Sequence, residues 1–219
     1  MRASRGWSIV RYLSKVGIVW SCGQRNKTMT TIEKRIEIFE NVRDIPYSLN
    51  IWNPEDVEKE QKGNCHAKSL YLRKLLEEEW YQIRNVTFPY KLRDFPDEVK
   101  YIPHQVDYHY ALQIYLDKQW VTIDPTYDIW LAWSCFHVNN WDGVSSTLYC
   151  ENPIWTIQYE WEKNMKLQNW YQEFCREMKE AYKKHDHLIT KYSEQMEMYI
   201  LSIRRDQKFI ESLPNNPLS

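Results

Sequence analysis

Apolar residues recur at helical spacing in two parts of the first half of the chain. The first part lies between residues 30 and 46, where a pair of threonines can cap a helix and a proline stops it. The second part runs from Cys65 to about Tyr81 without a glycine or a proline. Its leucines and Trp80 fall on one broad face, so we predict an amphipathic helix in each part.

Three shorter segments are apolar and aromatic and are separated by turn formers, which is typical of β-strands. The predicted strands are Ile83 to Tyr90, Tyr108 to Leu116 and Trp120 to Ile123. Residues 117–119 separate the last two segments and predict a hairpin. The stretch from Tyr47 to Gln61 has no clear period, and we expect an irregular connection there.

The last part of the chain has a helical pattern. No glycine or proline occurs between Pro153 and Pro214. Large apolar residues recur there at intervals of four, at Trp170, Phe174, Met178 and Tyr182. This spacing predicts two or three helices. Helices, then strands, then helices favour an α+β fold over alternating βαβ units.

The length of 219 residues suits one domain with an appendage. We predict a leader or disordered N-terminal segment at residues 1–28, a main domain at 29–150 and a helical C-terminal extension at 151–219. The first segment holds six basic residues and no acid. Arg11 and Lys15 interrupt its apolar stretch, which is unlike a signal peptide. The C-terminal helices are candidates for packing on the main domain or for a homo-oligomer contact.

Composition narrows the classes of protein to consider. The formal net charge is -1 with no clustered basic excess in the main domain, which argues against nucleic acid as a partner. The chain has no run of 18 apolar residues, so we expect no membrane span. Five scattered cysteines without a C-x-x-C pair favour a reducing, cytoplasmic location over a disulfide framework. The 11 tryptophans and 16 tyrosines predict a dense core and an aromatic-lined groove.

Candidate chemistry begins where a glycine precedes the second predicted helix. Gly63 is one of two glycines after residue 28, and it stands two residues before Cys65. A glycine permits a tight turn into the helix, which places Cys65 in the first helical turn. Free N–H groups there favour the thiolate and can stabilise a carbonyl oxygen under attack. Candidates for the second donor of this oxyanion hole are Gln61, Tyr47 and Trp52.

A thiolate nucleophile also needs a base, and the base needs an orienting partner. His109 begins one predicted strand, and Asp124 ends the next. Because the hairpin brings the beginning of the first strand beside the end of the second, we expect imidazole and carboxylate to meet. A buried cysteine alone is commonly an inert small hydrophobe, but the agreement of three residue types favours a nucleophile at Cys65.

Three stretches resemble the transglutaminase-like superfamily, whose fold is related to that of papain-type cysteine proteases. They read FENVRDIPYS, GNCHAKSLYLRKLL and HYALQIYLDKQWVTIDPTYD, and the resemblance covers roughly residues 32–145. In that family a cysteine follows a glycine at a helix start, a histidine begins a strand, and an aspartate stands in a D-P-T motif. The resemblance implies a papain-like core, a helix followed by an antiparallel sheet, with Cys65, His109 and Asp124 as a catalytic triad.

Two departures from the family pattern concern the groove and the substrate more than the triad. Lys118 stands where the hairpin glycine is usual, and residues 79–81 replace a glycine-isoleucine-proline turn. Active members of the superfamily share a thioester intermediate and differ in the acceptor, which is water or an amine. They include peptidases, peptide N-glycanases and protein cross-linking transamidases, and other members are inactive scaffolds.

The expected function is therefore thiol-dependent acyl transfer on an amide or peptide bond of a protein or peptide substrate. Hydrolysis by a cysteine peptidase or amidase is favoured because water is always present. Transamidation and an inactive binding module of the same fold are the alternatives. No phosphate-cradling loop marks a cofactor, so none is expected. A metal site is not expected either, since the spacing of Cys65, His66, His104 and His109 matches no common zinc pattern.

Overall fold

The computed structural model describes residues 30–92, 106–154, 157–159 and 190–206, together with residues 176, 180 and 187. Contacts divide the chain into two compact units, Met1–Thr30 and Thr31–Ser219. Every element named below belongs to the second unit. The leader expected at residues 1–28 and most of the helices expected before residue 190 lie outside the described residues.

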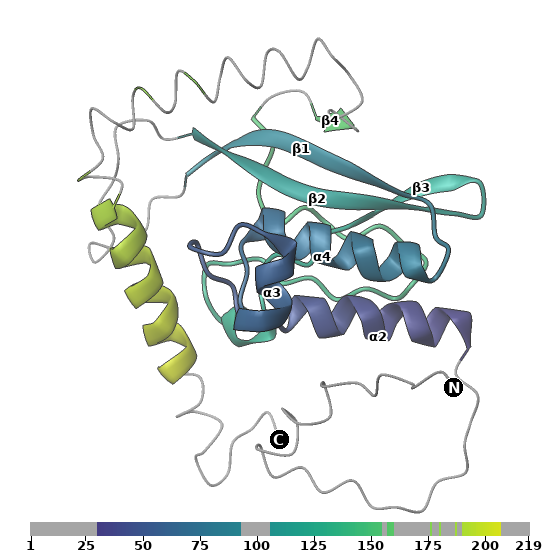
Figure 1. The fold of residues 1–219 in the computed structure, drawn as a ribbon, viewed down its shortest axis with the longest axis horizontal. Coiled ribbons are helices and arrows are strands. Elements are labelled where there is room, and N and C mark those ends of the chain that lie inside the picture. The colour runs from purple at the N-terminus through teal and green to yellow at the C-terminus, as the bar shows by residue number, and fades with distance from the viewer. Residues whose placement is uncertain are drawn as a thin grey trace, which may run out of the picture. The chain divides into compact units, whose positions relative to one another are not determined.

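A four-stranded antiparallel sheet forms one layer of the fold (Figure 1). Its strands are β1 (Ile83–Lys91), β2 (Val106–Leu116), β3 (Gln119–Ile123) and β4 (Gln158–Tyr159), arranged in the order β3-β2-β1-β4. The three predicted strands are confirmed. The fourth strand, β4, is two residues long, which is too short for alternation to signal it in the sequence.

The hairpin between β2 and β3 has a two-residue turn. Leu116 pairs with Gln119, and the turn residues Asp117 and Lys118 have φ values of 46° and 69°. Both values lie in the left-handed region, as a type I′ turn requires, and this region favours glycine. Lys118 therefore has a backbone cost at this position of the turn.

Both predicted helices of the first half are present, as α2 (Thr31–Arg43) and α4 (Cys65–Glu78). The prediction for the end of α4 was wrong in one respect. Trp80 was placed on its apolar face, but Trp80 has φ 66° and is 93% exposed. The chain leaves the helix at Glu78, so the ring no longer follows the helical face.

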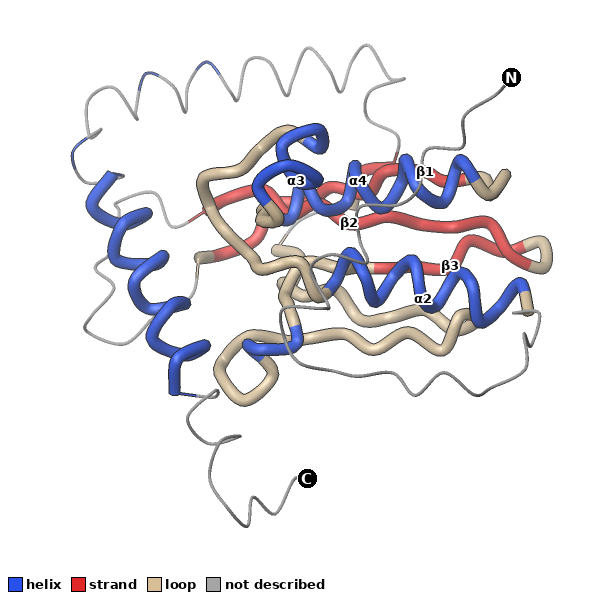
Figure 2. The backbone as a smooth tube through the Cα atoms, turned by 60° about the horizontal axis from the view of Figure 1, so that its bottom comes forward, coloured by secondary structure: helices blue, strands red, loops and turns tan. Residues whose placement is uncertain are grey.

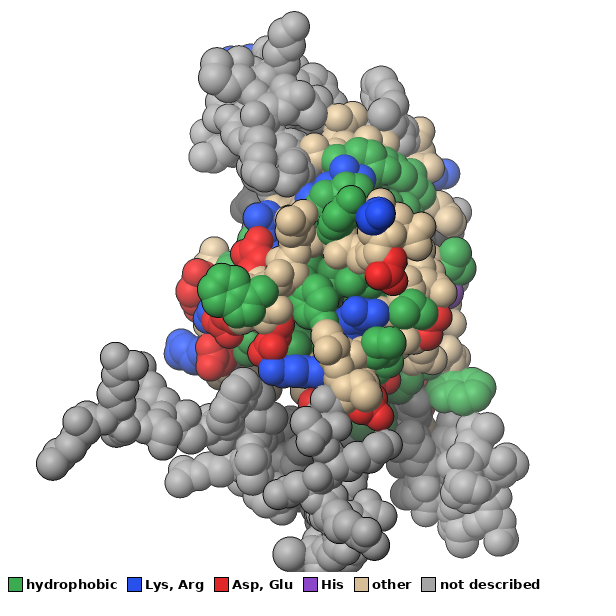
Figure 3. Space-filling model, turned by 90° about the vertical axis from the view of Figure 1, so that its right-hand side faces the viewer, with side chains coloured by type: hydrophobic (Ala, Val, Ile, Leu, Met, Phe, Trp, Pro, Cys, Tyr) green, Lys and Arg blue, Asp and Glu red, His purple; other side chains and the backbone are tan. Residues whose placement is uncertain are grey.

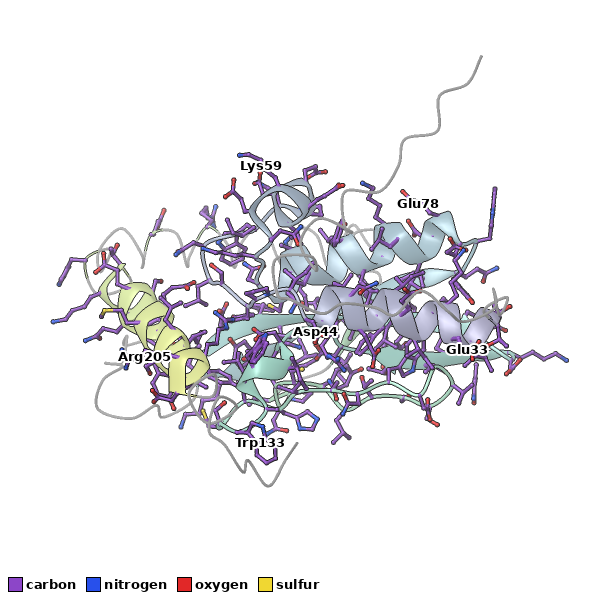
Figure 4. All side chains as sticks on the ribbon, turned by 90° about the horizontal axis from the view of Figure 1, so that it is seen from below. Glu33, Asp44, Lys59, Glu78, Trp133 and Arg205 are labelled. Carbon is purple, nitrogen blue, oxygen red and sulfur yellow. The ribbon has the colours of Figure 1, made fainter. Side chains whose placement is uncertain are left out.

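The connection expected to be irregular contains a helix, α3 (Pro54–Glu60). Pro54 occupies the first turn, and acidic residues near the N-terminus complement the helix dipole. Val57 is its one buried residue, so the segment shows no apolar period that sequence analysis could detect. Lys59 on this helix projects outward in Figure 4 and is paired with Glu60 at the surface.

The helix α4 packs against both the sheet and α2, and Figure 1 draws it between them. In Figure 2, α2 and α4 run side by side along the strands. The largest core cluster forms along this stack. It includes Phe39 and Val42 of α2, Leu72 and Leu76 of α4, and Leu112, Ile114, Val121 and Ile123 of the sheet. The end of the molecule shown in Figure 3 mixes acidic, basic and hydrophobic side chains without one dominant type.

Residues 190–206 form a helix, which confirms a helical element in this part of the predicted C-terminal region. Tyr192, Met196 and Ile200 recur every fourth position and are buried in a second core cluster with Tyr47 and Tyr127. The described elements thus make an α+β fold. Among the described residues, no helix has the length and apolar character needed to cross a membrane.

Candidate active site

The first turn of α4 is fixed from both sides of Cys65. The side chain of Asn64 caps the helix by accepting a 2.9 Å hydrogen bond from the Ala67 N–H. A Cβ on Gly63 would lie 2.9 Å from Cγ of Lys68, so glycine is required here for close packing. The prediction that Gly63 serves a tight turn was wrong. Its N–H and C=O instead form backbone hydrogen bonds with residues 46–48. Cys65 itself is partly exposed.

A buried lysine ties this first turn to two other segments. Lys68 is 0% exposed, and its ammonium donates to the carbonyl oxygens of Arg43, Ile45 and Thr126, each at 2.8 Å. Burial lowers the pKa of Lys68 to about 8, although the charge of Asp128 opposes this effect. The lysine thereby fixes the start of α4 relative to the end of α2 and to the segment that follows Asp124.

His109 and Asp124 meet as the hairpin predicts. His109 lies on β2 opposite Phe88 of β1, and Asp124 follows directly after β3. The His109 Nε2 atom lies 2.7 Å from Oδ2 of Asp124, and the two side chains are 1% and 0% exposed. The rings of Phe88 and Tyr90 lie 5.2 and 6.0 Å from the imidazole, centroid to centroid, and shield it from solvent.

The Asp124 carboxylate is fully hydrogen-bonded. Oδ1 accepts from the Thr126 N–H and hydroxyl at 3.2 and 2.7 Å, and Oδ2 accepts from the Cys150 N–H at 2.8 Å. Burial raises the pKa of Asp124, but the charge of His109 and these hydrogen bonds outweigh burial and lower the pKa below its ordinary value. The residue is therefore a fixed anion that orients the ring.

The histidine is held in its charged form. Burial lowers the pKa of His109, but the charge and hydrogen bond of Asp124, followed by the hydrogen bond with Cys65, raise it from 6.5 to about 10. Because Nε2 faces Asp124, Nδ1 is the ring nitrogen that remains available to interact with Cys65. The three side chains therefore form a chain in the order carboxylate, imidazolium and sulfur. This arrangement can stabilise a thiolate and return a proton to a leaving group.

The three candidates for the second oxyanion donor occupy different surroundings. The side-chain amide of Gln61 is exposed and donates to the Glu58 carbonyl at 2.7 Å. Trp52 is 56% exposed, and its carbonyl lies 3.1 Å from Nδ1 of His66. Tyr47 is 6% exposed, and its backbone is bridged to Gly63. Burial, and next the charge of Cys65, raise the pKa of Tyr47, so the phenol beside the sulfur stays protonated and can donate.

Sequence reasoning missed three residues that hold the site together. The role of Lys68 was not predicted because a lysine on an amphipathic helix is usually solvated. Cys150 contributes a backbone N–H, which no side-chain motif reveals. Asn139 donates from its amide to the carbonyl oxygens of Asp124 and Leu148 at 3.1 and 2.9 Å. Its position in a segment without regular structure offered no signal.

Cys65, Cys135 and Cys150 are free thiols, and only the last of them is buried. Among the described residues, no group of three side chains has the composition and proximity of a metal site, and His104 lies outside these residues. The sequence matches no family model, and no curated protein matches it. The geometry of the site is therefore the basis for proposing a function.

Proposed function

We propose that the chain catalyses thiol-dependent acyl transfer on an amide or peptide bond, with Cys65 as nucleophile, His109 as acid and base, and Asp124 as orienting group. One observation carries the proposal. A partly exposed cysteine on the first turn of a helix is close enough to a buried histidine to raise the pKa of its ring, and that ring is hydrogen-bonded to a buried carboxylate 2.7 Å away. This order of nucleophile, base and orienting group is the one that covalent acyl transfer requires.

The first half of the reaction forms a thioester. The thiolate of Cys65 attacks the carbonyl carbon, and the C=O electron pair moves to the oxygen. We propose the first-turn N–H groups of α4 and the Tyr47 hydroxyl as the donors that stabilise the developing charge. As the tetrahedral intermediate collapses, the C–N bond breaks and His109 gives its proton to the leaving amine. The acyl group then remains on the sulfur of Cys65.

The second half releases the acyl group. Water attacks the thioester carbon while His109 accepts its proton, and the C–S bond breaks to give a carboxylic acid and the thiolate. We propose water as the acceptor because it is always present, whereas an amine would need its own acceptor site. Since the thiol has to stay reduced between turnovers, a reducing compartment such as the cytoplasm suits this chemistry.

The same proposal extends to the fold. A helix that begins with the cysteine precedes antiparallel strands that carry the histidine and the aspartate, in this chain order. This order supports a papain-like core of the transglutaminase-like kind at residues 29–150. A helical extension at residues 151–219 completes the proposed domain organisation. The substrate under this proposal is a protein or peptide.

The test compares Cys65→Ala with the control Cys135→Ala. Cys65→Ala is expected to keep the wild-type circular dichroism spectrum and to lose all turnover of a fluorogenic peptide amide library, whereas Cys135→Ala keeps both. In the wild-type protein, iodoacetamide at neutral pH should alkylate Cys65 faster than the exposed Cys135, as read by mass spectrometry. Retained turnover in Cys65→Ala, or equal labelling of the two thiols, would refute the proposal.

A further inference from the structure

Trp52 is a large aromatic residue that the fold leaves at the surface. Its side chain is 56% exposed, although it stands between a partly buried isoleucine and the start of α3. Single exposed rings are common on proteins, so the meaning of this one depends on what lies next to it. Its neighbours are the residues that flank the candidate nucleophile.

Two hydrogen bonds hold the backbone of Trp52 beside Cys65. The Asn64 N–H donates to the Ile51 carbonyl at 3.1 Å. The His66 ring donates from Nδ1 to the Trp52 carbonyl, also at 3.1 Å, because a carbonyl oxygen only accepts. The residues immediately before and after Cys65 are thus bonded to two consecutive residues of one segment, which places Trp52 next to the first turn of α4.

A row of three rings supports the exposed indole. The His66 ring lies 6.5 Å from the Trp52 ring and 4.6 Å from the Tyr110 ring, centroid to centroid, and its contact with Tyr110 is edge-on. Tyr110 belongs to β2 and is buried, so the row runs from the sheet to the surface. Aromatic side chains have few rotatable bonds, and the indole is therefore a rigid surface beside the partly exposed Cys65.

We infer that the Trp52 ring is the wall of a subsite that binds an aromatic side chain in the acyl part of the substrate. The inference rests on the proposed acyl transfer. A ring that packs on the indole removes apolar surface of both groups from water, and the aromatic pair adds to this gain. The acyl part stays on the sulfur through both halves of the reaction, so a subsite for it positions the substrate in both steps. The substrates are then peptides with an aromatic residue at the attacked carbonyl or one residue before it.

Peptidyl chloromethyl ketones test this subsite because they carry only the acyl part of a substrate. The thiolate of Cys65 displaces chloride: the S–CH₂ bond forms, the C–Cl bond breaks and chloride leaves. Three acetylated dipeptide probes carry phenylalanine at the first position, at the second position or at neither, with alanine elsewhere. The aromatic preference is the rate of Cys65 alkylation by a phenylalanine probe divided by the rate of the all-alanine probe. Because both rates come from the same protein, the ratio does not depend on the reactivity of the thiol.

In the wild-type protein, at least one phenylalanine probe should react about tenfold faster than the all-alanine probe. The preference should fall toward one in Trp52→Ala. Trp52→Phe keeps a ring but lacks the indole N–H, so it should retain most of the preference. The control Trp80→Ala removes a ring that is 93% exposed beyond the other end of α4, a helix of 14 residues that spans about 20 Å, and should retain all of it.

Equal rates for the three probes, or a preference that survives Trp52→Ala, would overturn the subsite while Cys65 still reacts with iodoacetamide. A loss in Trp52→Phe as large as in Trp52→Ala would assign the effect to the indole N–H and would overturn the subsite as well. Failure of iodoacetamide and of every probe to label Cys65 would instead overturn the proposed function, and the subsite with it.

Discussion

The raised pKa of His109 allows us to predict how the free energy of unfolding of this protein changes with pH. The pKa of His109 is raised to about 10 although burial opposes this, because Asp124 is the main source of compensating charge. In Asp124→Asn the charge is removed while the burial remains, so the pKa should fall below its ordinary value of 6.5. The ring would then be neutral at pH 7.

The rise from 6.5 to about 10 corresponds to about 5 kcal/mol, at about 1.4 kcal/mol per pKa unit. A histidine with a raised pKa binds its proton more tightly in the folded state. Its contribution is therefore complete below pH 6.5 and is lost as the pH rises toward 10. Between pH 6.5 and 8 the loss should be about 2 kcal/mol. The contribution of Lys68 to stability changes with pH in the opposite direction. Its pKa is lowered to about 8, so this residue adds stability mainly above that pH.

The assay is urea unfolding at several pH values between 6.5 and 8, for wild type, Asp124→Asn and the exposed control Asp206→Asn. The unfolding free energy of wild type and control should fall across this range relative to that of Asp124→Asn by about 2 kcal/mol. NMR titration of the His109 ring gives the pKa directly. The same pH dependence in Asp124→Asn as in wild type would refute the assignment of this proton to the buried pair.

Two further variants test how the framework of the site is held. Lys68→Met leaves three buried carbonyl oxygens without their donor, so the unfolding free energy should drop by about 2–4 kcal/mol, and an unchanged urea midpoint would contradict this role. Lys118→Gly relieves a left-handed residue in the β2–β3 turn and should stabilise the protein by about 0.5–1 kcal/mol in thermal unfolding. Lys118→Ala keeps the strained φ, so an equal gain in that variant would show that charge removal, not backbone relief, is responsible.

The sequence predicted those parts of the fold that depend on local pattern. The apolar and aromatic runs of β1, β2 and β3 and the helical period of α2 and α4 reflect the burial of these elements, and residue types indicate which positions are buried. The meeting of His109 and Asp124 follows from a short hairpin, so it was also predictable. The helix α3 was missed because Val57 alone is buried, and Trp80 was misplaced because a helix end depends on backbone conformation.

The remaining support of the site comes from contacts between residues far apart in the sequence. Arg204, on the helix at residues 190–206, pairs with the buried carboxylate of Asp128 and donates to the Tyr47 carbonyl. Asp128 in turn accepts from the Tyr47 N–H at 2.8 Å. An arginine on a polar helix is usually a solvated charge, so its sequence context gave no signal of this role. Since these bonds fix the backbone of Tyr47 beside Gly63, the C-terminal helix belongs to the framework that positions the first turn of α4.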